Sequence, residues 1–158
     1  FLLNNGNIVD LDGTTPISFS IYKQDSSFMV IKHRNHLAVM SKLLPSNTTG
    51  SFANDFTQVS NLHLATGASS SPEVLLSGST GKYGMWAGDA NKSNTVLISD
   101  VNAIKIAQAN SQTGYLFTDV NMNGSVNISD VNLAKTTISA SGSGNTYRPI
   151  PAASNVPE

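Results

Sequence analysis

Alternating hydrophobic and polar residues run through the first 44 positions of the chain and predict β-strands there. Between Ile17 and Tyr22, the apolar residues Ile17, Phe19 and Ile21 alternate with serine, as in a strand with one buried face. The run 27–33 carries apolar residues on both faces, which is typical of a strand that is mostly buried in a sandwich. The pattern therefore predicts several short strands at the front of the chain.

Segments rich in Gly, Asn, Ser and Pro separate the apolar runs. Asn4-Asn5-Gly6 and Asp12-Gly13 predict tight turns, and polar segments at 45–50, 66–72 and 77–81 predict loops. We expect the apolar residues between these loops to anchor a core. These residues are Phe52, Phe56, Leu62, Leu64, Val74, Leu75 and Leu76.

Two segments in the second half of the chain have the periodicity of amphipathic helices. The first runs from Ser99 to about Asn110 and the second from Ser129 to about Ile138. We expect Ser99 to cap the first helix, with Asp100 acidic in its first turn. Two short helices of this kind are expected to bury their apolar faces against each other. These faces contain Val101, Ile104, Ile106 and Ala107 in the first segment, and Val131, Leu133, Ala134 and Ile138 in the second.

A twelve-residue pattern occurs twice and ends in the first turn of each predicted helix. Residues 89–100 read DANKSNTVLISD, and residues 119–130 read DVNMNGSVNISD. The copies start thirty residues apart and agree at positions 1, 3, 8, 10, 11 and 12. Both copies also place a short oxygen-bearing residue at positions 5 and 7. The duplication predicts two equivalent sites.

Oxygen atoms at alternate positions of a tight loop are the ligands that Ca²⁺ requires. This hard cation takes about six to eight oxygens, which side chains at positions 1, 3 and 5, a carbonyl at 7 and a carboxylate at 12 can supply. Gly124 at position 6 permits the positive φ of the sharp turn, and Asn94 is the next residue most able to adopt it. The candidate ligands are Asp89, Asn91, Ser93, Thr95 and Asp100 for one ion, and Asp119, Asn121, Asn123, Ser125 and Asp130 for a second.

Asx turns are the alternative explanation, because Asn, Asp and Gly favour them without any metal. A single copy leaves the two explanations balanced, whereas two copies that agree at six positions favour calcium. Each loop offers only two carboxylates. We therefore expect weak binding, in the range of about 10⁻⁴ to 10⁻³ M that is typical of extracellular modules.

The duplicated loop resembles the dockerin family over roughly Gly88 to Ile138. Dockerin loops end in Asp, as both loops do here, and lack the helix in front of an ordinary EF-hand loop. The first copy departs from the family pattern at Ser93, Asn94 and Leu97. The resemblance implies two structural calcium ions. It also implies helical faces for cohesin-type partners, here at Ile98, Ser99, Lys105, Ile128, Ser129 and Lys135. The alternative to a partner-binding face is that the apolar loop residues belong to the core. These residues are Val96, Ile98, Val126 and Ile128.

The front of the chain has a resemblance of its own. The segments IVDLDG, VIKHRNHLAVMS and MWAGDAN are similar to a module near the C-terminal ends of large secreted or surface-anchored bacterial proteins. In such proteins a strand-rich segment precedes the position of Phe1. The resemblance implies that this chain lacks the first strand or strands of its sandwich, which leaves an edge that a neighbouring chain can fill.

Composition narrows the choice of partners and location. Charged residues make up 12% of the chain, the net charge is −1 and no basic run follows a phosphate backbone, so nucleic acid is not an expected partner. No apolar run approaches the length of about 20 residues that a membrane span needs, so no membrane insertion is expected. Cysteine is absent, which leaves the calcium loops as the expected cross-links. The sequence starts without a Met or a signal peptide, so we expect a processed or excised piece of an extracellular protein.

Candidate catalytic groups are few. His33 and His36 suggest a metal site, but we favour hydrogen bonds to the backbone of a tight connection, because no Asp or Glu is near in sequence. No Ser-His-Asp signature is present. A glycosidase pair would have to use Asp10, Asp12, Asp25 or Asp55. We therefore expect no enzyme, and we expect Trp86 to be a buried anchor rather than a sugar-stacking platform.

The sequence thus predicts a mainly β protein with a small α part. We expect a β-sandwich-like (Ig-like) domain at 1–86, a dockerin-like calcium-binding pair at 87–140 and an extended tail at 141–158. The predicted function is a non-catalytic, calcium-stabilised module for surface assembly or adhesion, located extracellularly or at the cell surface of a bacterium. Its expected partners are other protein chains, including copies of itself. The alternatives are a carbohydrate-binding accessory module that binds polysaccharide and a true dockerin that binds a cohesin.

Overall fold

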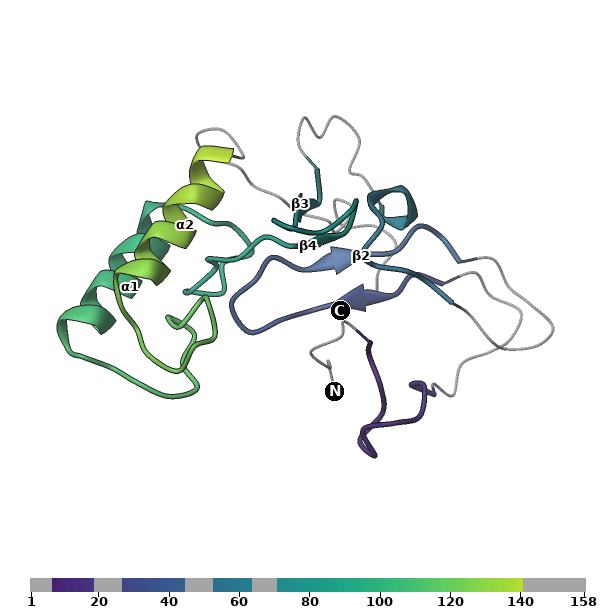
Figure 1. Cartoon of the computed structure of the whole chain (residues 1–158), viewed down its shortest axis with the longest axis horizontal. Coiled ribbons are helices and arrows are strands. Elements are labelled where there is room, and N and C mark those ends of the chain that lie inside the picture. The colour runs from purple at the N-terminus through teal and green to yellow at the C-terminus, as the bar shows by residue number, and fades with distance from the viewer. Residues whose placement is uncertain (1–6, 19–26, 45–52, 64–70, 141–158) are drawn as a thin grey trace.

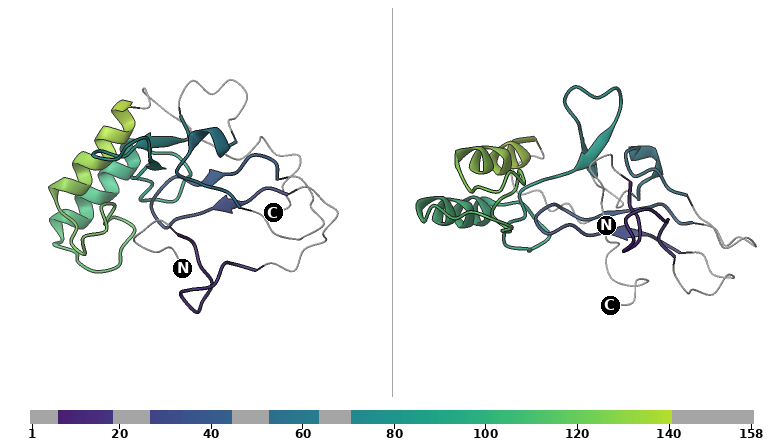
Figure 2. Two further views of the ribbon diagram at one scale, coloured as in Figure 1. Left: turned by 45° about the vertical axis from the view of Figure 1, so that its right-hand side comes forward. Right: turned by 60° about the horizontal axis from the view of Figure 1, so that its bottom comes forward.

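The computed structural model describes residues 7–18, 27–44, 53–63 and 71–140 (Figure 1). Within these ranges the chain forms a small mixed α/β fold with two short antiparallel sheets and two α-helices. The helices lie side by side at one end of the molecule, and the strands lie beyond them (Figures 1 and 2). The elements are β1 (Val30–Ile31), β2 (Val39–Met40), a 3-10 helix (Val59–Asn61), β3 (Glu73–Leu75), β4 (Tyr83–Met85), α1 (Ile98–Ala109) and α2 (Ile128–Ala140).

Strand β2 is the more buried strand of the first sheet, which has two strands. It pairs antiparallel with β1, with Val30 opposite Met40 and Ile31 opposite Val39. On its other side Ser41 forms an isolated bridge with Leu62. Val39 and Met40 are 1% and 0% exposed, whereas Val30 in β1 is 36% exposed. The prediction that the run 27–33 forms a mostly buried strand is therefore wrong, because only two of its residues are in a strand and none of them is fully buried.

Strands β3 and β4 form a hairpin whose tip projects from the rest of the molecule (Figure 2). Leu75 and Leu76 near this tip are 54% and 45% exposed, so their prediction as core anchors is wrong. Leu62 is fully buried, as predicted, and Phe56 and Val74 are half-buried. The predicted anchors Phe52 and Leu64, the turn at 4–6 and most of the strand predicted at 17–22 lie outside the described residues.

The two predicted helices are confirmed, each beginning one residue earlier than the pattern suggested. Their contact buries Val101 and Ile104 of α1 and Val131 and Ala134 of α2, all at 0% exposure. Ile106 is 65% exposed, because the buried stripe of α1 continues at Ala107 instead. Neither helix is long and apolar enough to cross a membrane, a finding that covers the described residues only.

Helix α2 also packs closely on the residues just before the first loop. The Thr137 hydroxyl donates a 2.7 Å hydrogen bond to the Ala87 carbonyl. Gly88 has φ +121°, and a Cβ there would lie 3.1 Å from the Ala134 Cα. Only glycine fits this approach without displacing the helix.

Trp86 joins the sheets to the loop region, as predicted for a buried anchor. It is 8% exposed and packs with Leu37 and Val96. Its indole N–H donates a 2.9 Å hydrogen bond to the Ser71 carbonyl, which satisfies its polar atom. One side chain thus contacts the front of the chain and the first loop, across the predicted domain boundary at residue 86.

Glu73 in β3 is a buried carboxyl with a predictable effect on stability. The residue is 2% exposed, and its Oε2 atom has no hydrogen-bond partner. Burial, with a smaller contribution from the nearby Asp55 carboxylate, raises the pKa of Glu73 to about 7. The folded protein therefore holds this proton more tightly than the unfolded chain does. Its contribution to stability is fully present below the unfolded pKa of about 4.5 and is lost as pH rises through about 7.

We expect the Glu73→Gln substitution to remove this pH dependence. Relative to the Glu73→Gln variant, the native protein should lose about 1 to 2 kcal/mol of unfolding free energy between pH 5 and pH 8, because the native carboxyl ionises in a buried site. Urea denaturation of both proteins at the two pH values, with the same excess of calcium, measures the difference. An unchanged difference between pH 5 and pH 8 would contradict the assignment.

Candidate metal centre

Both loops begin and end with a buried aspartate. Asp89 and Asp100, at positions 1 and 12 of the first loop (89–100), are 5% and 0% exposed. Asp119 and Asp130, at the same positions of the second loop (119–130), are 1% and 0% exposed. Carboxylates are almost never fully buried unless they are paired or coordinate an ion. Each loop therefore contains two buried carboxylates that need a partner or an ion.

The aspartate at position 1 accepts hydrogen bonds from the backbone at positions 5 and 6 in both loops. In the first loop, the Ser93 and Asn94 N–H groups donate to the two carboxylate oxygens of Asp89 at 2.8 and 3.0 Å. In the second loop, Asn123 and Gly124 donate to Asp119 at 3.1 and 2.9 Å. In both loops Oδ1 of this aspartate accepts from the N–H at position 5, and Oδ2 accepts from the N–H at position 6.

The aspartate at position 12 closes each loop back on itself. Asp100 Oδ1 accepts from the Asn91 N–H at 3.0 Å, and Asp100 Oδ2 accepts from the Leu97 N–H at 2.9 Å. Asp130 makes the equivalent contacts with Asn121 and Asn127, at 3.1 and 2.9 Å. These carboxylates also lie in the first turn of each helix, where negative charge is favourable.

Ser99 does not cap α1, contrary to the prediction. The helix begins at Ile98, so Ser99 lies inside its first turn and Leu97 is the capping residue. The Asp100 carboxylate accepts from the Leu97 N–H instead. In the second loop the Asn127 side chain accepts a 2.8 Å hydrogen bond from the Ser129 N–H and caps α2.

In both loops the side-chain oxygens at positions 1 and 3 accept from the same N–H group, and in the first loop the oxygens at positions 5 and 7 lie together. In the first loop, the Asn91 side-chain oxygen and Asp89 Oδ1 both accept from the Ser93 N–H. The Ser93 hydroxyl lies 3.1 Å from the Thr95 carbonyl oxygen and 2.9 Å from the Thr95 hydroxyl. In the second loop, Asn121 likewise accepts from the Asn123 N–H. Hydrogen bonds thus join neighbouring candidate ligand residues within each loop.

Positions 4 and 6 adopt the left-handed backbone conformation in both loops. The prediction for position 6 is confirmed, with φ +60° at Asn94 and φ +87° at Gly124. The same conformation at position 4, with φ +61° at Lys92 and at Met122, was not predicted, since neither residue type favours it. The contacts of the aspartates at positions 1 and 12 determine the path of the loop strongly enough to hold these residues there.

The donor set and the buried charge fit a hard cation. Burial raises the pKa of Asp89, the Asn94 and Ser93 N–H groups oppose this rise, and the Asp100 carboxylate adds to it. A divalent ion would relieve the repulsion between the two acids. The donors at positions 1, 3, 5, 7 and 12 are all oxygen atoms, which suits Ca²⁺ and not zinc. In the described ranges no three His, Cys, Asp or Glu side chains group around a possible metal position, so any shell here would consist mainly of neutral oxygens. Asx turns explain the contacts of Asn91 with the Ser93 N–H and of Asn121 with the Asn123 N–H, but not the two buried acids of each loop.

The turn at 33–36 in the front of the chain contacts both loops. The Asn35 carbonyl accepts the N–H groups of Gly88 and Asp89 at 3.0 and 3.1 Å. The Asn35 side-chain amide donates to the Asp119 carbonyl at 2.7 Å. Arg34 Nη2 lies 3.8 Å from Asp119 Oδ2, and its guanidinium lies over the Tyr115 ring. Sequence reasoning missed these contacts, because nothing local to the turn indicates what lies opposite it.

His33 and His36 hydrogen-bond to each other and to Asn35. Their Nδ1 atoms are 2.9 Å apart, and His36 Nδ1 lies 2.8 Å from the Asn35 side-chain oxygen. Because that oxygen can only accept, His36 Nδ1 carries the proton and His33 Nδ1 accepts. Burial, with smaller effects of His33 and Arg34, lowers the pKa of His36 to about 4 and keeps it neutral. The predicted contacts to the turn's own backbone are thus replaced by contacts between side chains.

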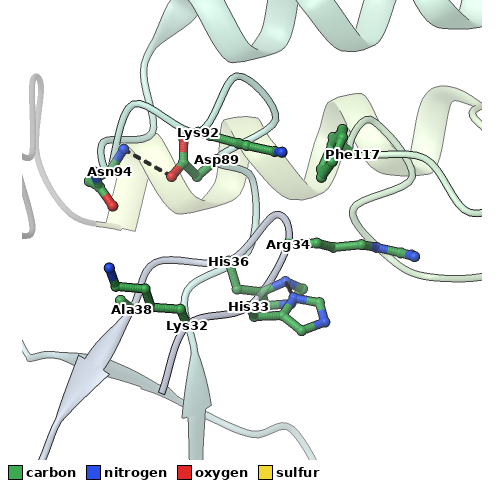
Figure 3. A pocket seen from close by; sticks show the side chains of 9 residues that line it. All are labelled: Lys32, His33, Arg34, His36, Ala38, Asp89, Lys92, Asn94 and Phe117. Carbon is green, nitrogen blue, oxygen red and sulfur yellow. Dashed lines mark hydrogen bonds between the residues drawn. The ribbon is translucent and has the colours of Figure 1, made fainter. Parts of the chain in front are cut away.

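A pocket of about 420 Å³ opens beside the first loop (Figure 3). The His33 and His36 rings lie together on one wall, and the dashed contact between Asn94 and Asp89 marks the opposite one. Lys92 extends from the first loop to the Phe117 ring, with its Nζ atom 3.5 Å from the centroid. The remaining lining residues are Lys32, Arg34 and Ala38.

The other candidate carboxylates lie away from the loops. Asp10 and Asp12 belong to the predicted turn, in which the Thr14 and Thr15 N–H groups hold the pKa of Asp12 at about 2. Asp55 is exposed and pairs with Lys82 at 3.2 Å. Asp25 lies outside the described residues.

No protein-family model matches the chain, and no curated protein or solved structure matches it either. The two loops are therefore interpreted from their geometry and from the repeat in the sequence.

We expect Ser93→Asp to strengthen calcium binding at the first loop by about tenfold, because it adds a third carboxylate at position 5. Without calcium the same change should destabilise the protein, since the added carboxylate would face Asp89 and Asp100. Isothermal titration calorimetry and thermal melts with calcium or EGTA measure the two opposite effects. Asn123→Asp is the matched variant of the second loop. A change in melting temperature of the same sign in calcium and EGTA would contradict the ligand role.

Proposed function

We propose that this chain is a non-catalytic, calcium-stabilised interaction module of the extracellular surface of a bacterium. In this proposal residues 87–140 are a dockerin-like pair that holds two calcium ions. The observation that supports it best is the hydrogen-bond pattern shared by the two loops, in which four buried aspartates take the same positions. Asp, Asn, Ser and Thr at positions 1, 3, 5, 7 and 12 would hold the ions.

Calcium would stabilise the fold by neutralising buried charge. Each loop is continuous with a helix, so fixing position 12 also fixes the first turn of α1 or α2. The front of the chain contacts the same loops through Trp86 and Asn35. A weakly bound ion suits a structural role where calcium is abundant, as it is outside cells.

The proposed role in assembly depends on the edge of the front sheet. We propose that the front is an Ig-like sandwich whose open edge at β1 receives a strand from another copy or another protein. Val30 on β1 is 36% exposed, and among the described residues only β2 pairs with this strand. Strand addition to an open edge supplies main-chain hydrogen bonds and would link modules into larger assemblies.

Dockerin activity is a second candidate, favoured by the exposure of two equivalent isoleucines. Ile98 and Ile128, at position 10 of the two loops, are 66% and 57% exposed. The neighbouring Val96 and Val126 are buried and belong to the core. The accompanying polar residues of this face, Ser99, Ser129, Lys105 and Lys135, are all exposed. A cohesin-like partner would bury this pair of isoleucines in a soluble one-to-one complex.

Circular dichroism and light scattering, with calcium and then with excess EGTA, test the proposed function. We expect EGTA to reduce the helix signal and to dissociate large assemblies into monomers, because without calcium the two buried carboxylates of each loop repel each other. Asp100→Asn and Asp130→Asn should each weaken the calcium response, whereas Asp10→Asn, outside the loops, should not.

The other outcomes of this experiment separate the candidates. A calcium-stabilised monomer at all protein concentrations would contradict self-assembly and favour a cohesin-like partner. Indifference of both the helix signal and the melting temperature to EGTA would contradict the calcium proposal itself.

A further inference from the structure

We infer that Asn35 is a positioning residue that couples the two calcium loops, so that calcium bound at one loop strengthens binding at the other. This inference rests on the proposed calcium function. It assigns a specific role to the turn at 33–36, which lies far from both loops in the sequence.

Asn35 contacts the first residue of each loop through different atoms. Its main-chain carbonyl accepts the N–H groups of Gly88 and Asp89 at 3.0 and 3.1 Å. Its side-chain amide donates to the Asp119 carbonyl at 2.7 Å. The residue is 0% exposed, so water does not replace either contact at low cost. The backbone of Asp89 and the backbone of Asp119 are therefore both hydrogen-bonded to the same residue, Asn35.

The neighbours of Asn35 fix the direction of its side chain. The Asp119 carbonyl can only accept, so the amide nitrogen faces it, and the Asn35 side-chain oxygen is left to accept from His36 Nδ1 at 2.8 Å. A flipped amide would place its oxygen against the Asp119 carbonyl, so that two acceptors would face each other. Arg34, the preceding residue, lies 3.8 Å from the Asp119 carboxylate and supports the same contact.

No more direct polar route joins the loops. Both loops are fully described, and no hydrogen bond is seen between residues 89–100 and residues 119–130. The apolar contact between α1 and α2 joins the elements that follow the loops, whereas Asn35 joins their first ligands. A calcium ion that fixes Asp119 would fix Asn35, and with it the backbone of Asp89.

Single-loop variants measure the coupling. Asp100→Asn disables the first loop and Asp130→Asn disables the second, so calorimetric titration of each variant gives the affinity of the remaining loop. In the native background we expect each remaining loop to bind about 5- to 150-fold more weakly than it does in the intact protein, the range of typical coupling between sites. In Asn35→Ala the affinity of either loop should no longer depend on the other.

Nuclear magnetic resonance supplies a readout that needs no Asn35 variant. In the Asp100→Asn chain, where only the second loop binds, calcium should shift the Gly88 and Asp89 amide resonances, because both donate to Asn35. Adding Asn35→Ala should reduce these shifts to near zero. Unshifted Gly88 and Asp89 resonances at calcium saturation of the second loop would overturn the inference, even if Asn35→Ala fails to fold.

Two controls separate coupling from general stability. Asn61→Ala removes a 3.2 Å hydrogen bond from an asparagine side chain to the Asp55 carbonyl, away from the loops. Leu62→Ala should destabilise the front core at a fully buried residue that bridges Ser41. Both should keep the coupling, and its loss in Leu62→Ala would contradict a specific role of Asn35. Independent binding at two functional loops would overturn the coupling alone, whereas absence of any calcium binding would overturn the proposed function.

Discussion

The structure depends on how four buried aspartates are satisfied at positions 1 and 12 of the two loops. Each carboxylate accepts two backbone N–H groups of its own loop, so the loop takes its shape from the side chain that it buries. Hydrogen bonds to a carboxylate are stronger than those between neutral groups, yet they do not remove its negative charge. Two such acids in one small loop leave a charge that a bound cation is suited to balance.

The helices and the front of the chain both contact these loops. The position-12 aspartates lie in the first turns of α1 and α2, and the helices bury Val101, Ile104, Val131 and Ala134 between them. Trp86 and Asn35 bring the front of the chain onto the same region. The strands described in the front are two or three residues long, so we expect these contacts with the loops to contribute to its stability. Calcium bound at the two loops would in this way also stabilise the helices and the front of the chain.

Local sequence was sufficient for the features that arise within a few residues. The helices at 98–109 and 128–140, the turn at Asp12-Gly13 and the positive φ at Asn94 and Gly124 were all predicted. Helical periodicity, turn chemistry and loop spacing act over distances of one to twelve residues. The strands were predicted less well, since their pairing depends on distant segments, and a run such as 27–33 carries no information about which strand becomes central.

The sequence by itself therefore determined the two loops and their helices, because the donors and acceptors of each lie within one short segment. Only the tertiary structure decided that the turn at 33–36 meets both loops, and that the hairpin tip leaves Leu75 and Leu76 exposed. The contact from Asn35 to Asp119 spans 84 residues. No local pattern encodes such a contact, because it forms only when the folding of everything between brings the two groups together.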